Sequence, residues 1–237
     1  MPNASNQTMP DTTIFLGVLS SGRLGLLKQC LNSAYANVGP GITLTGLVVF
    51  DDDTEGFVNC PKHPWLTKRL LYPRHYTVRA ANIIAESMLN LQPAPDFVVL
   101  VDDDTEFLQY GWGTAAVEFH THHFPDGMGI IDFLSPRECC QTMTTPKFLR
   151  EFLGGQYYDP SYIHCYHDTD LRERVEGYFA CATRLYSVDA DGTASYPQPV
   201  FVHKRDVNAG AMGRFLQLRM LDLKNFQKKG WPLYDAP

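Results

Sequence analysis

The sequence predicts an α/β fold with a mostly parallel central sheet flanked by helices, and three of its features lead to that prediction. Apolar runs alternate along the 237 residues with segments whose apolar residues recur at helical spacing, as in strand–helix–strand units. The run 97–101 is unbroken and β-branched, which is typical of a strand buried on both faces. Polar clusters follow several of the apolar runs, and the carboxyl ends of parallel strands are where α/β sheets bind ligands.

In the first half of the chain, we expect three strands and two helices. The strands are residues 14–19, 42–50 and 97–101. The helices are residues 24–35, where Leu24, Leu27 and Leu31 recur at helical spacing, and residues 77–91. Residues 57–76 contain three prolines and are expected to form an irregular connection.

In the second half, short strands and helices are expected around a long loop. The expected helices are residues 114–123, 167–175 and 214–228, and the expected strands are residues 128–134, 177–184 and 200–203. Residues 135–165 are rich in Pro, Gly, Tyr and Cys and are expected to be a loop region over the site. Residues 1–11 are polar and are expected to be a mobile tail, so a single domain would cover residues 12–237.

The composition is that of a globular protein, with 44% hydrophobic and 19% charged residues. The net charge of -6 gives no overall basic footprint for nucleic acid, although a local basic groove remains open. No apolar run reaches the roughly 18 residues needed to span a membrane, and the N-terminus lacks the pattern of a signal peptide. We therefore expect a soluble cytoplasmic protein whose six cysteines are reduced thiols.

Three adjacent carboxylates, Asp102, Asp103 and Asp104, directly follow the strand 97–101. Along an extended chain, alternation puts Asp102 and Asp104 on one side and Asp103 on the other. Because adjacent like charges repel, a hard divalent cation with oxygen ligands would relieve this run. The alternative is a solvated acidic turn. The same Asp-Asp-Asp-Thr-Glu sequence also follows the strand 42–50, as residues 51–55.

Further polar residues occur in a characteristic order. A hydroxyl and cation turn follows the first strand, two acids follow the second, an asparagine begins the helix before the acid run, a His-Asp-Thr-Asp-Leu segment comes later, and a histidine ends the last strand. These residues are Ser20, Ser21, Arg23, Asp51, Asp52, Asn82, residues 167–171 and His203. This order resembles the GT-A class of nucleotide-sugar glycosyltransferases, particularly the large inverting family with a DxD motif, over roughly residues 12–206.

The resemblance implies a Rossmann-like nucleotide-binding half over residues 12–106 and an acceptor half over residues 107–237. It implies nucleotide contacts from the following residues: Ser20, Ser21, Arg23, Asp51, Asp52, Arg79, Asn82, Asp102 and Asp103. The usual glycine of the segment 79–82 is absent here. The resemblance implies a metal site of Asp102, Asp104 and His203, with Asp104 the direct ligand and Asp102 near the ribose or a metal-bound water.

The segment 167–171 resembles the family's Glu-Asp-x-Asp-Leu segment, which holds the catalytic base. His167 replaces the usual glutamate, so both Asp168 and Asp170 remain candidates, with Asp168 preferred. Carboxylates suit Mg²⁺, and one imidazole would favour Mn²⁺. The alternative is a structural role, in which these acids lie in the first turn of a helix and pair with Arg172 or Arg174.

The expected function is a metal-dependent, inverting transfer of a sugar from a nucleotide donor, UDP-linked by preference, to a hydroxyl acceptor. Glycans, proteins and hydroxymethylated DNA bases are all possible acceptors. The alternatives are a nucleotidyltransferase of sugar phosphates and a non-catalytic nucleotide-sugar or glycan-binding module. Loop aromatics suit either sugar stacking or core packing, and they are Trp112, Tyr157, Tyr158 and Tyr162. The oligomeric state is not predicted.

Overall fold

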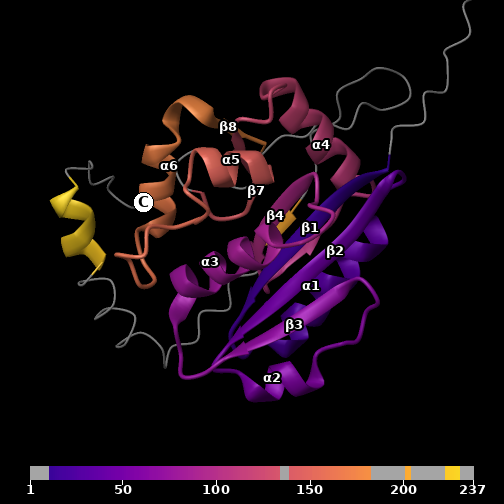
Figure 1. Cartoon of the computed structure of the whole chain (residues 1–237). Helices are drawn as coiled ribbons and strands as arrows, with labels where there is room; N and C mark the ends of the chain where they lie inside the picture. The colour runs from indigo at the N-terminus through magenta and orange to yellow at the C-terminus, as the bar shows by residue number, and fades with distance from the viewer. Residues whose placement is uncertain (1–10, 134–138, 183–200, 204–221, 230–237) are drawn as a thin grey trace, which may run out of the picture.

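The computed structural model describes residues 11–133, 139–182, 201–203 and 222–229, and these form the expected α/β fold. Within them, seven strands form one sheet in the order β3-β2-β1-β4-β7-β6-β8 (Figure 1). The strands are β1 (Thr12–Ser20), β2 (Ile42–Asp51), β3 (Leu66–Leu71), β4 (Phe97–Asp102), β6 (Ile130–Asp132), β7 (Thr142–Thr144) and β8 (Phe179–Cys181). Strands β3, β2, β1 and β4 are parallel, and β7 runs antiparallel to both of its neighbours. The prediction of a mostly parallel sheet is confirmed.

Helices cover both faces of the sheet. One face packs against α1 (Leu24–Asn37), α2 (Thr54–Asn59) and α4 (Trp112–His123), and the other against α3 (Tyr76–Leu89), α5 (Pro146–Glu151) and α6 (His167–Arg174). Alternate residues of β4 enter the two cores, since Val99 and Val101 lie in the first and Val98 and Leu100 in the second. The unbroken apolar run therefore reflects burial on both faces, as predicted.

Two segments expected to be irregular contain regular structure. Residues 57–76 include the end of α2 and the edge strand β3, whose sequence Leu-Thr-Lys-Arg-Leu-Leu carries two adjacent cations. The region 135–165 contains β7 and α5. The sequence pattern did not predict the two strands. Strand β3 is half-exposed at the sheet edge, and β7 is a three-residue strand with two threonines.

The expected strand at 200–203 is present as β9 (Phe201–His203), but it lies outside the main sheet. It pairs antiparallel with β5 (Thr105–Phe107), which follows the acid run. Of the helix expected over residues 214–228, the described part is helical over 222–228. A short 3-10 turn, η1 (Glu176–Tyr178), precedes β8. The expected N-terminal tail, apart from Asp11, lies outside the described residues.

No helix within the described ranges has the length and apolar character needed to cross a bilayer. All six cysteines lie in the described part of the chain, and the structure joins no two of them in a disulfide. Cys30, Cys60 and Cys139 are buried and pack in the two cores.

The contact between α3 and β1 depends on a glycine. A Cβ on Gly17 would lie 2.3 Å from Cγ2 of Ile84, a side chain with no exposed surface in the second core. Because packed interiors resist added volume, the absence of a side chain at Gly17 sets how closely α3 approaches the sheet.

We therefore expect Gly17→Ala to lower the free energy of unfolding by about 1–3 kcal/mol. The matched control is Gly25→Ala in the first turn of α1, where an added Cβ meets nothing within 4 Å. That substitution should be neutral or slightly stabilising, because alanine is the better helix former. Urea denaturation measures both, and equal stabilities for the two variants would contradict the close packing at Gly17.

Candidate functional site

Three neighbouring parallel strands end in polar residues at the same edge of the sheet. Strand β1 ends at Ser20, β2 at Asp51 and β4 at Asp102. The register pairs Leu19 with Asp102 and Ser20 with Phe50, so the three strand ends are adjacent. This edge is where an open α/β sheet binds ligands.

The acid run turns instead of continuing as an extended chain. Asp103 has no exposed surface, and its Oδ2 accepts hydrogen bonds from Ser20 Oγ at 2.8 Å and from the Ser21 amide at 3.2 Å. The two ends of the Arg23 guanidinium bind Asp103 and, at 2.5 Å, Oδ2 of Asp104. Arg23 thus brings Asp103 and Asp104 together, so Asp103 does not lie on a side apart from Asp104, as strict alternation along an extended chain would place it.

Burial and the neighbouring charges shift the pKa values of Asp103 and Arg23. Burial raises the pKa of the Asp103 carboxyl above its ordinary value, although Arg23, Ser20 and Ser21 oppose that shift. Burial also disfavours the charge on Arg23, but the acids Asp103, Asp104 and Asp102 together raise its pKa. The predicted nucleotide-binding cation is thus the counter-charge of the acid run.

Asp102 is held separately, by a residue that the sequence did not point to. The buried side chain of Gln141 donates to Oδ2 of Asp102 at 3.2 Å and accepts a hydrogen bond from the Asp102 amide at 3.1 Å. It also accepts from Thr105 Oγ1 at 3.1 Å. Gln141 lies in the connection that reads as a loop, so no pattern in the sequence links it to Asp102.

The acids after β2 organise two loops. The carboxylate of Asp51 accepts hydrogen bonds from the amides of His75 at 2.6 Å and Tyr76 at 2.8 Å, at the start of α3. Asp53 caps α2 through the Gly56 amide and also accepts from the Gly22 amide at 3.0 Å. Asp52, between them, is exposed and has a left-handed backbone with φ 61°. Of the predicted pair Asp51 and Asp52, only Asp52 therefore presents its side chain to solvent.

The two predicted residues of α3 lie in different surroundings. Arg79 is exposed, whereas Asn82 is buried and exchanges two hydrogen bonds with the backbone of Tyr158, at 2.8 and 3.0 Å. The other loop aromatics are also buried, with Trp112 and Tyr157 at 0% and Tyr162 at 2% exposure. These rings belong to the core, which decides between the two alternatives for them.

The segment 139–141 joins the acid run to Asp168. Cys140 Sγ lies 3.4 Å from Oδ2 of Asp168, and its neighbour Gln141 holds Asp102. The Cys139 amide donates to the Asp168 carbonyl at 3.2 Å. Burial raises the pKa of the nearby Tyr158 hydroxyl, and the charges of Asp168 and Asp102 add to that shift. The charges of both carboxylates therefore act on the pKa of the same buried hydroxyl group.

Asp170 has a different environment from Asp168, which is half-buried. Asp170 has no exposed surface, and its carboxylate binds Arg174 Nε at 2.8 Å, Lys229 Nζ at 2.8 Å and the Tyr162 hydroxyl at 3.3 Å. Two cations thus compensate this buried charge. Its contacts join α6 to the end of the chain's last described segment.

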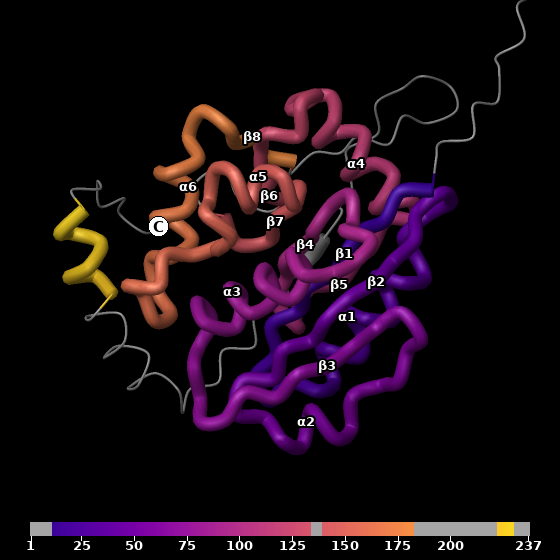
Figure 2. Tube along the Cα trace, in the orientation of Figure 1, coloured from indigo at the N-terminus to yellow at the C-terminus, as the bar shows by residue number. Residues whose placement is uncertain are grey.

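That last segment, residues 222–229, packs beside the loop that precedes α6 (Figure 2). The buried carboxylate of Asp222 accepts hydrogen bonds from the amides of residues 163, 164 and 165, at 3.0, 2.8 and 2.7 Å. Phe226 stacks on Tyr166, and Lys229 also pairs with Asp159 at 2.6 Å. Sequence patterns showed an amphipathic helix here but gave no sign that it fixes the segment carrying Asp168.

The acids at the end of β4 offer the ligand type that hard divalent cations prefer. Asp102 and Asp104 offer carboxylate oxygens, and Mg²⁺ is typically bound by one or two carboxylates together with substrate phosphates. No group of three or more His, Cys, Asp and Glu side chains that could hold a metal ion occurs within the described ranges. The strand register places residue 203 beside Thr105, which follows Asp104.

No protein-family model matches this chain, and no curated protein matches it by sequence. Its fold matches that of the mannosyltransferase PcManGT from Pyrobaculum calidifontis in complex with GDP-Man and Mn²⁺, with a TM-score of 0.57 and 17% identity over 94% of this chain and 65% of that chain. It also matches TarS from S. aureus, with a TM-score of 0.52 and 11% identity over 72% of this chain and 35% of TarS. The chain therefore spans less than two thirds of either protein, and it has the expected GT-A type fold.

From these contacts of Arg23, we expect Arg23→Gln to lower the free energy of unfolding by an amount that depends on pH. Because the folded pKa of Asp103 lies above its ordinary value of 3.8, the stability that Asp103 contributes falls as the pH rises through the folded pKa. Loss of Arg23 raises that pKa further. The variant should be less stable than the wild type by about 2 kcal/mol at pH 7.5, and the deficit should shrink as the pH falls toward 4.

Urea denaturation of both proteins between pH 4 and 8 measures this difference. Arg79→Gln is the matched control, since Arg79 is exposed and forms no ion pair with any described residue. A deficit that does not change with pH would show that Arg23 does not control the ionisation of Asp103.

Proposed function

We propose that this chain is a metal-dependent glycosyltransferase that moves a sugar from a nucleoside diphosphate donor to a hydroxyl acceptor, with inversion at the anomeric carbon. One observation carries the proposal. The segment 139–141 contacts Asp168 and Asp102 at the ligand-binding edge of a sheet whose fold is shared with a mannosyltransferase. Residues 12–106 would bind the donor, and the remainder would bind the acceptor.

The loop after β1 and the acids after β2 would bind the nucleotide. Ser21, Arg23 and Asp52 all have exposed or half-exposed side chains at this edge. Ser20 and Asp51 would support these residues without contacting the nucleotide. The side chain of Ser20 binds Asp103, and that of Asp51 binds the start of α3. The sequence favoured a UDP-linked sugar, whereas the matched mannosyltransferase holds GDP-Man, so the donor test includes both bases.

Asp102 and Asp104 would hold Mn²⁺ or Mg²⁺, with His203 as a further ligand. The ion, when bound, would neutralise the negative charge of the diphosphate leaving group. Arg23 binds Asp104 and is half-exposed. Its guanidinium would add a second positive charge beside the diphosphate.

Asp168 is the proposed general base, since it is half-exposed and reaches the site through Cys140. The Thr169 amide donates to its Oδ1 at 2.8 Å, which fixes the carboxylate and leaves Oδ2 directed toward Cys140. A carboxylate placed in this way can accept the proton of an acceptor hydroxyl as that oxygen attacks. Asp170 is unsuited to this role, because it is fully buried between two cations.

The first prediction from this proposal is metal-dependent donor binding. A nucleotide at about 100 times its Kd stabilises a protein by about 2.7 kcal/mol, which is about 5–10 °C in Tm for a chain of this size. UDP, GDP, UDP-glucose and GDP-mannose, each with and without Mn²⁺, are to be tested by thermal denaturation. The wild type should respond to one base with Mn²⁺ present, and Asp104→Asn should not.

Glu118→Gln is the matched control for that experiment. It removes one exposed acid on α4 that lies outside the proposed site, so its response should equal that of the wild type. If no diphosphate nucleotide stabilises the wild type, the acid run is a structural turn and the proposal fails.

The second prediction separates the two candidate bases. Asp168→Asn should lower transfer by about 10²- to 10⁴-fold while leaving donor binding and Tm close to the wild type. Asp170→Asn should instead lower stability by about 2–4 kcal/mol, because Arg174 and Lys229 lose their shared partner. Below its Tm, it should transfer sugar at a rate within about tenfold of the wild type.

The measurements are product formation with the donor found above and thermal denaturation of each variant. The opposite pattern, an inactive but stable Asp170→Asn beside an active Asp168→Asn, would place the base at Asp170.

A further inference from the structure

Two long stretches of this acidic chain contain no acid, residues 12–50 and residues 56–85, and the second holds more cations. Residues 56–85 contain none of the 26 Asp and Glu residues but five of the 20 Lys and Arg residues. We call these five residues the basic edge, and they are Lys62, Lys68, Arg69, Arg74 and Arg79. The stretch includes β3, the edge strand of the sheet, and the loops on both sides of it. Positive charge is thus concentrated in this part of the sequence.

Most of the basic edge is exposed and lacks a counter-charge. Lys62, Arg69 and Arg79 are exposed and form no ion pair with any residue that the structure describes. Arg74 is exposed as well, and its ion pair with Asp51 is long, at 3.9 Å. Binding of a polyanion to these cations would therefore not have to break a strong ion pair within the protein.

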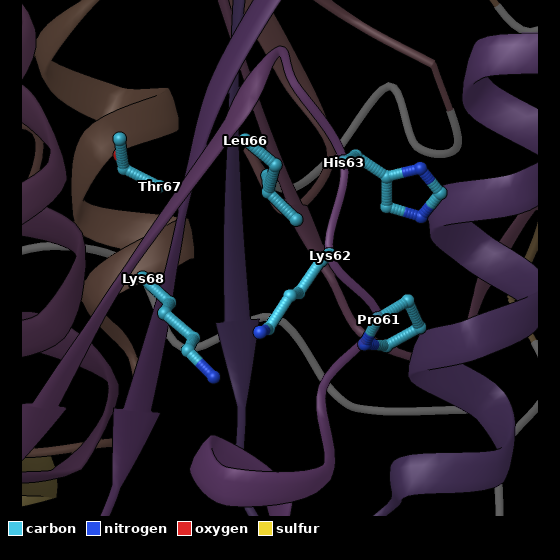
Figure 3. A pocket seen from close by; sticks show the side chains of 6 residues that line it. All are labelled: Pro61, Lys62, His63, Leu66, Thr67 and Lys68. Carbon is cyan, nitrogen blue, oxygen red and sulfur yellow. The ribbon is translucent and has the colours of Figure 1, made fainter.

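Cations flank β3 on both faces. Alternation along the strand directs Lys68 toward α2, where its Nζ lies 4.6 Å from the centre of the Phe57 ring, and directs Arg69 to the opposite face. On the α2 side, an open pocket of about 480 Å³ is lined by Pro61, Lys62, His63, Leu66, Thr67 and Lys68 (Figure 3). The side chains of Lys62 and Lys68 extend into the same space there.

The basic edge continues to the proposed donor site. The loop after β3 carries Tyr72, which is 77% exposed, followed by Arg74 and His75. The amide of His75 donates to Asp51, at the end of β2. A chain lying along β3 therefore reaches the edge where the donor would bind, and it passes an exposed aromatic ring on the way.

We propose that the basic edge binds a nucleic-acid strand and that this strand carries the acceptor hydroxyl. Exposed cations on an edge strand, in the loops beside it and at the start of α3 suit contacts with phosphates, and an exposed tyrosine offers a stacking surface for a base. The role as acceptor rests on the proposed function, whereas binding itself does not. Lysine and arginine on an edge strand also prevent sheet-to-sheet association, but that role alone gives no affinity for phosphates.

Fluorescence anisotropy with a labelled 20-nucleotide single-stranded DNA, measured from 25 to 200 mM NaCl, tests the binding. The wild type should bind, with a logarithm of affinity that falls linearly with the logarithm of salt concentration. Lys62→Gln/Arg69→Gln should lower the affinity about tenfold at 50 mM NaCl and reduce the salt slope by about 1.4, corresponding to two lost phosphate contacts.

Lys224→Gln/Lys228→Gln is the matched control, because it removes the same charge from two exposed lysines on the segment 222–229, far from β3 in Figure 1. Its affinity should fall less than twofold. An equal loss in both double variants, or no binding by the wild type at 25 mM NaCl, would overturn the proposal. Equally tight binding of polyglutamate would assign the surface to an acidic protein and would also overturn it.

The same variants separate this inference from the proposed function. Lys62 and Arg69 lie outside the proposed donor site, so thermal stabilisation by nucleotide and Mn²⁺ should be unchanged in Lys62→Gln/Arg69→Gln. Donor binding without DNA binding would overturn the inference alone. DNA binding without any donor binding would overturn the proposed function and, with it, the role of the strand as an acceptor.

Discussion

The ion pair between Arg23 and the buried carboxylate of Asp103 is the interaction on which the candidate site at the end of β4 depends. Three adjacent carboxylates at the end of a buried strand repel one another, and Asp103 is fully removed from water. Arg23 supplies the positive charge from the loop after β1, and Ser20 and Ser21 supply hydrogen bonds. The end of β4 and the loop that would bind a nucleotide therefore hold each other in place.

A second set of contacts joins the sheet edge to the later part of the chain. Gln141 fixes Asp102, its neighbour Cys140 contacts Asp168, and Asn82 holds the backbone of Tyr158. These contacts are made by an amide, a thiol and a backbone group, none of which adds charge next to the acids. Gln141, Cys140 and Asn82 are thus distinct from the side chains proposed to act on a substrate.

The fold could be predicted further than the site. The α/β class, the strands at 14–19, 42–50 and 97–101 and the helix beginning near residue 77 follow from period and burial, which are local properties of the sequence. The edge strand β3 could not be predicted in this way, since one face of it is exposed to solvent and its two cations break the apolar pattern.

At the site, the acid run and Arg23 were recognisable as polar residues at strand ends. The pairing of Arg23 with Asp103 and Asp104 was not, because it depends on a turn at Asp103 that alternation cannot foresee. Gln141 and Asp222 act across 39 and 57–59 positions of sequence, and no spacing encodes such contacts.

The net charge of the chain differs from the charge near β3, and this difference also depends on contacts that the sequence does not show. The net charge of -6 argued against nucleic acid as a partner, but it counts buried acids together with exposed cations. Asp103, Asp132, Asp170 and Asp222 have no exposed surface, and internal donors or cations satisfy their carboxylates. Exposed charges act over about 8–10 Å at physiological salt, so a phosphate near β3 experiences Lys62 and Arg69 rather than the average of the chain. An acidic protein can therefore present a basic surface when its acids are used to organise the interior and its cations are left at an edge.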